Sequence, residues 1–249
     1  MAPIGIISDF GKEDEYIASI KGKILSINPE AKIIDISNEI PQYCIKNASF
    51  VLSEAVKTFP KGSTFIAMVK TESIDRKNYI FLQTETGLNF IGPNNGILTL
   101  IDQKFDIQEK RQISNEDLVK VETPTNFPER DIIAPIAAHL NQGMNISDLG
   151  PNIEEIELLN ILTPTIENGK IRGEIMNIDH FGNLISNITG DLVKEIGSFG
   201  KKLEISINDS ELSIPLLESF EETEKGEKLS YVGTSGNLEI GKTQGDLAR

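Results

Sequence analysis

The sequence has few of the side chains on which familiar catalytic and metal centres depend. It contains 249 residues, with no tryptophan, a single cysteine and two histidines. A lone cysteine, Cys44, excludes an internal disulfide and the cysteine-rich kinds of zinc site. The two histidines, His139 and His180, lie far apart in the sequence, so we expect no metal site. The glycine-rich, zinc-protease and nucleophile-elbow motifs of common enzyme classes are also missing.

Basic residues are scarce as well. The chain has 24 Lys and Arg against 38 Asp and Glu, which gives a formal net charge of −14. Such a balance argues against nucleic acid and anionic membranes as partners, because both require a basic surface. No apolar run is long enough to span a bilayer, and the N-terminus lacks the basic region of a signal peptide. We therefore expect a cytoplasmic protein.

The first part of the chain alternates between two hydrophobic patterns. Short apolar runs rich in β-branched residues alternate with segments whose apolar side chains recur every three or four residues. This alternation predicts a mostly parallel sheet with helices on its faces. The expected strands are 3–9, 32–36 and 64–69, with helices at 14–27 and 47–59, a hairpin within 79–101 and a helix at 130–143.

The last part of the chain has shorter alternating runs separated by Gly and Asn or Asp turns. The expected strands are 170–178, 201–207, 211–216, 228–233 and 237–241. Such spacing is typical of a small antiparallel barrel or sandwich. The sequence thus predicts an α/β protein with an N-terminal, mostly parallel α/β sandwich domain and a C-terminal antiparallel β-barrel domain. The expected bounds are 1–152 and 169–249, with a linker at 153–168.

Polar turns in both domains are candidates for ligand binding. Asp9 follows the first expected strand, where ligands of open α/β sheets tend to bind, and its carboxylate can accept from two vicinal hydroxyls. Asp179 could hold an ammonium group and Asn183 an adenine edge, and Thr234 and Ser235 could hold a carboxylate. The alternative is that all of these are simply turn residues.

Several long stretches occur in the order found in one known family. They are IGIISDFGKEDEY (4–16), KGKILSINPEAKIIDISNEIP (21–41), GPNNGILTL (92–100), ERDIIAPIAAHLNQG (129–143), GEIMNIDHFGNLISNI (173–188) and YVGTSGNLEIGKTQGDLA (231–248). Through them the chain resembles the S-adenosyl-L-methionine (SAM) hydroxide adenosyltransferases, relatives of the SAM-dependent fluorinases and chlorinases. The resemblance covers both expected domains.

The resemblance implies a homotrimer that binds SAM or adenosine between the N-domain of one subunit and the C-domain of the next. It implies that water or hydroxide attacks the ribose C5′ of SAM, which yields adenosine and L-methionine without a cofactor. The matching positions are Asp9 at the ribose diol, Tyr43 lining the pocket, Asp179 at the ammonium, Phe181 and Asn183 at the adenine, and Thr234 and Ser235 at the carboxylate.

The sequence departs from the family at the three residues that handle the water. Where the family has an Asp, an Arg and a His, this chain has Lys70, Lys77 and Pro128. Proline has neither an ionisable side chain nor an N–H group. A lysine in place of the carboxylate would also repel the sulfonium, by roughly 3 kcal/mol at about 5 Å and an effective dielectric of about 20. The neighbouring groups that could substitute are Glu72, Asp75, Arg76 and Glu129.

Three functions therefore stay open from the sequence. The chain could be a SAM-cleaving enzyme with a rebuilt nucleophile-handling loop, in which Glu72, Asp75 or Glu129 is the base. It could be a catalytically silent protein that binds adenosine or a nucleotide, with Lys70 and Arg76 favouring a 5′-phosphate. It could also be a structural trimer with a vestigial pocket.

Overall fold

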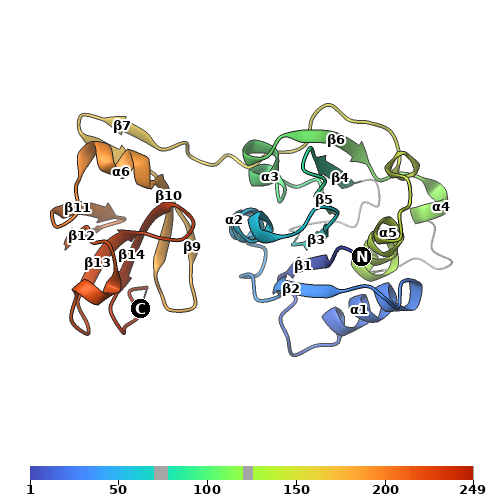
Figure 1. Ribbon diagram of the computed structural model, residues 1–249, viewed down its shortest axis with the longest axis horizontal. Helices are drawn as coiled ribbons and strands as arrows, with labels where there is room; N and C mark the ends of the chain where they lie inside the picture. Colours follow the sequence, from blue (N-terminus) through green and yellow to red (C-terminus); the bar gives the residue numbers. More distant parts are fainter. Residues whose placement is uncertain (70–77, 120–125, 249) are drawn as a thin grey trace. The chain divides into compact units, whose positions relative to one another are not determined.

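The computed structural model describes residues 1–69, 78–119 and 126–248, and the chain divides into two compact units. The N-terminal unit is Met1–Leu159 and the C-terminal unit is Asn160–Arg249 (Figure 1). Residues 153–159 of the expected linker belong to the N-terminal unit. There the Leu159 N–H donates to Thr99 Oγ1 at 2.8 Å, and Ile153 and Ile156 pack against the core.

The N-terminal unit is built on one six-stranded sheet in the order β2-β1-β3-β5-β4-β6. Strands β2, β1, β3 and β5 are parallel, and β4 is antiparallel to both of its neighbours, which confirms the mostly parallel sheet. The strands are β1 (Ile4–Ser8), β2 (Ile33–Ser37), β3 (Thr64–Met68), β4 (Tyr79–Thr84), β5 (Asn89–Pro93) and β6 (Ile107–Gln112).

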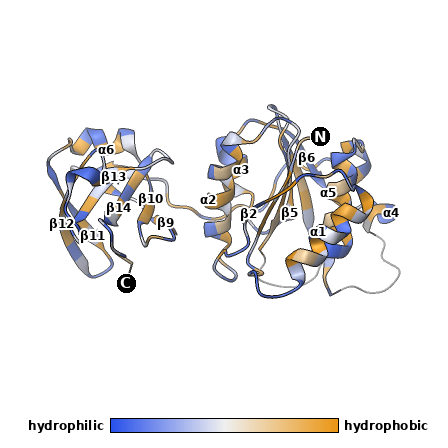
Figure 2. Ribbon diagram, turned by 60° about the horizontal axis from the view of Figure 1, so that its bottom comes forward, coloured by the Kyte–Doolittle hydropathy of each residue, from blue (hydrophilic) through white to orange (hydrophobic). Residues whose placement is uncertain are grey.

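Helices cover both faces of this sheet, as Figure 2 shows. Side chains of β1 alternate between two cores: Ile4 and Ile6 join α1 and α5 on one face, and Ile7 joins α2 on the other. A central strand buried on both faces therefore has a nearly continuous apolar sequence. The helices are α1 (Tyr16–Ile27), α2 (Ile45–Ala55), α3 (Thr99–Lys104), α4 (Glu116–Val119) and α5 (Ala134–Asn141), with the short turns η1 (Val56–Thr58), η2 (Glu129–Ile133) and η3 (Ile146–Leu149). In the described ranges, no helix is long and apolar enough to cross a membrane.

The C-terminal unit contains antiparallel sheets, as predicted, but in its described residues they stay open and do not close into a barrel. A four-stranded sheet has the order β13-β14-β10-β9, and two hairpins pair β11 with β12 and β7 with β8. The strands are β7 (Thr165–Glu167), β8 (Lys170–Arg172), β9 (Ile175–Ile178), β10 (Leu184–Thr189), β11 (Lys202–Ile207), β12 (Ser210–Pro215), β13 (Lys228–Val232) and β14 (Asn237–Lys242). The short turn η4 (Phe220–Glu222) lies between β12 and β13.

A helix that the sequence analysis did not anticipate, α6 (Gly190–Ile196), packs against the four-stranded sheet. Thr189 caps it by accepting from the Leu192 N–H at 3.4 Å, and Val193 is buried against Leu216 and Leu238. The apolar face of the sheet is thus covered by a helix as well as by strands, which is one reason why the sheet need not close on itself.

Candidate functional site

The loop after β1 holds Asp9 at the carboxyl end of the parallel sheet. The preceding Ser8 is fully buried and donates to Asn38 Oδ1 at 2.9 Å, and the Gly11 N–H donates to the Asn38 carbonyl at 2.7 Å. Asp9 Oδ2 accepts the Tyr43 N–H at 2.9 Å. A carboxylate has about four acceptor sites, so this bond leaves capacity for two ligand hydroxyls.

Tyr43 has an unusual backbone conformation for an exposed aromatic residue. Its φ is +62°, in the left-handed region, and its side chain is 64% exposed. A bulky residue in this region is strained, and such strain tends to persist at binding sites. The bond from its N–H to Asp9 helps to hold it there, so the structure brings Asp9 and Tyr43 together.

Replacing Tyr43 by glycine is expected to stabilise the protein by about 0.5–1 kcal/mol, because glycine adopts the left-handed region without strain. Urea unfolding measures the change. Tyr43→Phe, which keeps the ring and the strain, is the control and should unfold like the wild type. A glycine variant less stable than the wild type would show that the Tyr43 side chain stabilises the fold.

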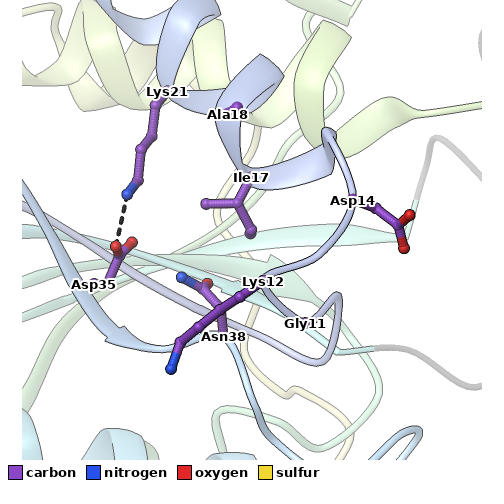
Figure 3. Close-up of a pocket in the computed structure, with 8 residues that line it drawn as sticks. All are labelled: Gly11, Lys12, Asp14, Ile17, Ala18, Lys21, Asp35 and Asn38. Carbon is purple, nitrogen blue, oxygen red and sulfur yellow. Dashed lines mark hydrogen bonds and ion pairs between the residues drawn. The ribbon is translucent and has the colours of Figure 1, made fainter.

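A hollow of about 310 Å³ lies beside this loop (Figure 3). Charged side chains of both signs line it. Lys21 points toward Asp35, with 2.6 Å between Nζ and Oδ2. Lys12 forms an ion pair with Glu39, a residue that does not line the hollow. Its lining residues are Gly11, Lys12, Asp14, Ile17, Ala18, Lys21, Asp35 and Asn38. The sequence analysis did not single out Asp14, which lies in the same strand-to-helix loop as Asp9.

The segment that contains Pro128 packs beside the Asp9 loop. The rings of Phe10 and Phe127 lie 5.7 Å apart between centroids, and Tyr16 lies 5.4 Å from Phe127. Pro128 is buried at the start of η2, a π-helical turn leading into α5. Turns of this kind occur frequently at functional sites. The structure thus places Phe127, the residue before Pro128, against Phe10, the residue after Asp9.

Glu129 is buried beside Pro128 and has a defined partner. Glu129 is only 4% exposed, and its Oε1 accepts a hydrogen bond from the Tyr79 hydroxyl at 2.9 Å. Burial, with the nearby Glu129 carboxylate adding to it, raises the pKa of Tyr79 well above its usual range. The other positions singled out at the water-handling loop, Lys70, Glu72, Asp75, Arg76 and Lys77, lie outside the described residues.

In the C-terminal unit, Asp179 organises the turn between β9 and β10. Its Oδ1 accepts the N–H groups of Phe181 and Asn183, both at 2.9 Å, and its Oδ2 accepts the Asn183 amide at 2.8 Å. Asn183 is buried, whereas Phe181 is 72% exposed. Gly182 has a φ of +83°, and a Cβ there would lie 2.1 Å from Asp246 Oδ1. The turn interpretation therefore accounts for Asp179 and Gly182, and the exposed Phe181 ring is the part that local folding does not explain.

A buried glutamate that the sequence analysis missed connects Asp179 with the 233–236 turn. Glu239, on the central strand β14, is 6% exposed, and its Oε2 accepts the Tyr231 hydroxyl at 2.5 Å. Its carboxylate lies close enough to Asp179 for their charges to interact, and the turn approaches it so closely that a Cβ at Gly233 would lie 1.9 Å from Oε1. Thr234 is exposed beside them. An acid within the buried run NLEIG was the available signal, because unpaired acids are rarely buried.

The fold and these residues define a class of protein: an α/β unit with a carboxylate at the end of its first strand, joined to an antiparallel unit with a buried carboxylate group. Comparison with known proteins identifies it further. Profiles of the SAM hydroxide adenosyltransferase N-terminal and C-terminal domains match residues 4–150 and 173–249. The chain belongs to the SAM hydroxide adenosyltransferase family, which confirms the resemblance.

Individual relatives cover nearly the whole chain. An (R)-S-adenosyl-L-methionine hydrolase of Thermus thermophilus is 28% identical over 98% of this chain and 93% of its own. A fluorinase of Actinoplanes is 26% identical over 98% and 92%. A crystal structure of an uncharacterized conserved protein from Thermotoga maritima has a TM-score of 0.92 and 32% identity, and covers 98% of this chain and 94% of that one.

Proposed function

We propose that this protein binds SAM or adenosine and that its hydrolysis of SAM to adenosine and L-methionine is greatly slowed. The observation that carries the proposal is the Asp9 carboxylate, held at the end of β1 by the Tyr43 N–H at 2.9 Å, with acceptor capacity left for a ribose diol. Asp179, Phe181, Asn183, Thr234 and Ser235 are the proposed contacts to the remainder of the ligand.

The slow step would be the generation of the nucleophile. In the reaction, a water oxygen forms a bond to C5′, the C5′–S bond breaks with its electron pair going to sulfur, and the water loses a proton. The sulfonium is an activated leaving group, so the protein's tasks are alignment and removal of that proton. Pro128 can accept no proton, and the loss of positioned acid–base help costs about 10²- to 10⁴-fold in rate.

The purified protein is therefore expected to release adenosine and methionine from SAM at no more than about a hundredth of the rate of a relative that retains the Asp, Arg and His. Chromatography with mass detection measures both products. Calorimetry with adenosine, SAM and AMP measures binding separately from turnover. Turnover at the relative's rate would contradict the damaged reaction centre, and failure of all three ligands to bind would leave only the structural role.

A second candidate is retained hydrolysis with Glu129 as the base. It is favoured by the position of Glu129 directly after Pro128, where the carboxylate is buried and bonded to Tyr79 at 2.9 Å. In this case Glu129→Gln would abolish SAM cleavage while adenosine still binds, and Tyr79→Phe would alter the pH profile of cleavage. Cleavage unchanged in Glu129→Gln would exclude this base.

The homotrimer that the resemblance implies stays a prediction, and so does the union of the Asp9 group and the Asp179 group in one ligand site. Light scattering of the purified chain measures the mass of the assembly. A monomer that still binds adenosine would mean that Asp9 and its neighbours suffice for recognition of the nucleoside.

A further inference from the structure

Three aromatic rings form a cluster beside Asp9. Between centroids, the Phe10 ring lies 5.7 Å from the rings of both Tyr16 and Phe127, and Tyr16 lies 5.4 Å from Phe127. Both contacts of Phe127 are edge-to-face, which is an arrangement that aromatic pairs prefer. Phe10 lies in the loop after β1 and Tyr16 begins α1, whereas Phe127 comes from a distant segment of the chain. The cluster therefore joins two segments of the N-terminal unit next to the proposed ribose contact.

The segment that carries Phe127 is fixed to the core by contacts of its own. Glu129, two residues on, is buried and accepts a hydrogen bond from the Tyr79 hydroxyl on β4 at 2.9 Å. The Phe127 carbonyl accepts the N–H groups of Arg130 and Asp131 at 3.2 and 3.1 Å. The Arg130 guanidinium lies over the Phe127 ring, 5.5 Å from its centroid. The ring is thus held firmly enough to support a neighbouring side chain.

The loop that carries Asp9 needs such support, because a glycine follows Phe10. Gly11 has a φ of +74°, and glycine restricts its own backbone less than any other residue. The loop is otherwise held by hydrogen bonds: the Gly11 N–H donates to the Asn38 carbonyl at 2.7 Å, and Asp9 accepts the Tyr43 N–H at 2.9 Å. Since Phe10 is bonded directly to Asp9, the rings that hold Phe10 also limit the orientation of the Asp9 carboxylate.

We propose that Phe127 is a positioning residue for the Asp9 carboxylate and that it acts through the Phe10 ring, without touching the ligand. Two ribose hydroxyls can bond to Asp9 only if its oxygens are already placed, and a loop ordered in advance lowers the entropic cost of binding. This inference rests on the proposed function and deepens it. The segment around Pro128 supports recognition of the nucleoside, although proline stands there in place of the family's histidine.

A double-mutant cycle in ligand affinity tests the proposal. Phe127→Ala is expected to raise the Kd for adenosine about two- to tenfold, which is the range that the loss of an aromatic pair contributes. Phe10→Ala should weaken binding as well. The double variant should bind no more weakly than the weaker single variant, because both changes remove the same support and their effects do not add. Calorimetric titrations of the four proteins with adenosine and with SAM measure the cycle.

Further variants separate positioning from a general loss of stability. Phe127→Tyr keeps the ring and should restore the wild-type Kd. Phe127→Leu keeps most of the apolar volume without the aromatic edge, so it should fold and still bind more weakly. The matched control is Phe59→Ala, which removes a half-buried ring on the opposite face of the sheet, 4.9 Å from Phe65 between centroids. It should lower the free energy of unfolding and leave the Kd unchanged.

The outcomes separate this inference from the proposed function. If the wild type binds either ligand and the Phe127→Ala and Phe127→Leu variants keep its Kd, the ring only stabilises the fold and the inference is wrong. Losses that add in the double variant would mean that Phe127 contacts the ligand itself, and a Phe127→Tyr variant as weak as Phe127→Ala would exclude support by the ring. The proposed function survives all three results. If the wild type binds neither ligand, the proposed function falls and this inference falls with it.

Discussion

Adenosine binding is expected to weaken by about 3 kcal/mol, or roughly a hundredfold in Kd, when Asp9 is replaced by asparagine. The carboxylate would accept charge-assisted hydrogen bonds from the ribose hydroxyls, and each such bond contributes about 1.5–3 kcal/mol. Asparagine keeps one oxygen to accept the Tyr43 N–H, so the loop after β1 should keep its conformation. Calorimetric titration of both proteins with adenosine measures the difference.

The control for this variant is Asp191→Asn, which removes a carboxylate whose side chain is 92% exposed and which pairs with Lys194 at the surface. Its adenosine affinity should equal that of the wild type. Asp9→Ala removes the acceptor for Tyr43 as well, so it should lose stability in addition to affinity. If Asp9→Asn bound adenosine as tightly as the wild type, Asp9 would be a turn residue and no ligand contact.

Replacing Phe65 by alanine is expected to lower the free energy of unfolding by about 3–5 kcal/mol. Phe65 on β3 is fully buried, stacks on Phe90 with 5.0 Å between ring centroids and meets the edge of Phe59 at 4.9 Å. Its ring also fills the space beside Gly5, where a Cβ would lie 2.6 Å away. The cavity left by alanine would sit in the core between the sheet and α2, which cannot collapse without moving a central strand.

Urea unfolding of the Phe65 variant can be followed by circular dichroism, because the chain has no tryptophan. Phe199→Ala, at a position 49% exposed, is the matched control and should change stability by less than about 0.5 kcal/mol. Equal loss of stability in the two variants would contradict the assignment of Phe65 to the core.

The carboxylates illustrate how far a site can be predicted from one chain. Asp9 and Asp179 were found because each follows a strand and begins a polar turn, a feature visible within a few residues. Glu239 was not found, because its role depends on Tyr231 across a strand pair and on Asp179 from a distant turn. Asp14 was missed for a different reason: an exposed acid in a loop has no distinguishing pattern until a hollow is seen beside it.

The amino-acid sequence by itself determined the mostly parallel N-terminal sheet and the antiparallel character of the C-terminal part, since hydrophobic periodicity is a local property. Strand β6 escaped prediction because its sequence, IQEKRQ, lies at the sheet edge and is mostly polar. Only the tertiary structure decided that the C-terminal strands form open sheets and that Phe10 meets Phe127 beside Pro128. Strand partners and close approaches between distant segments depend on the packing of the whole unit, which no local pattern specifies.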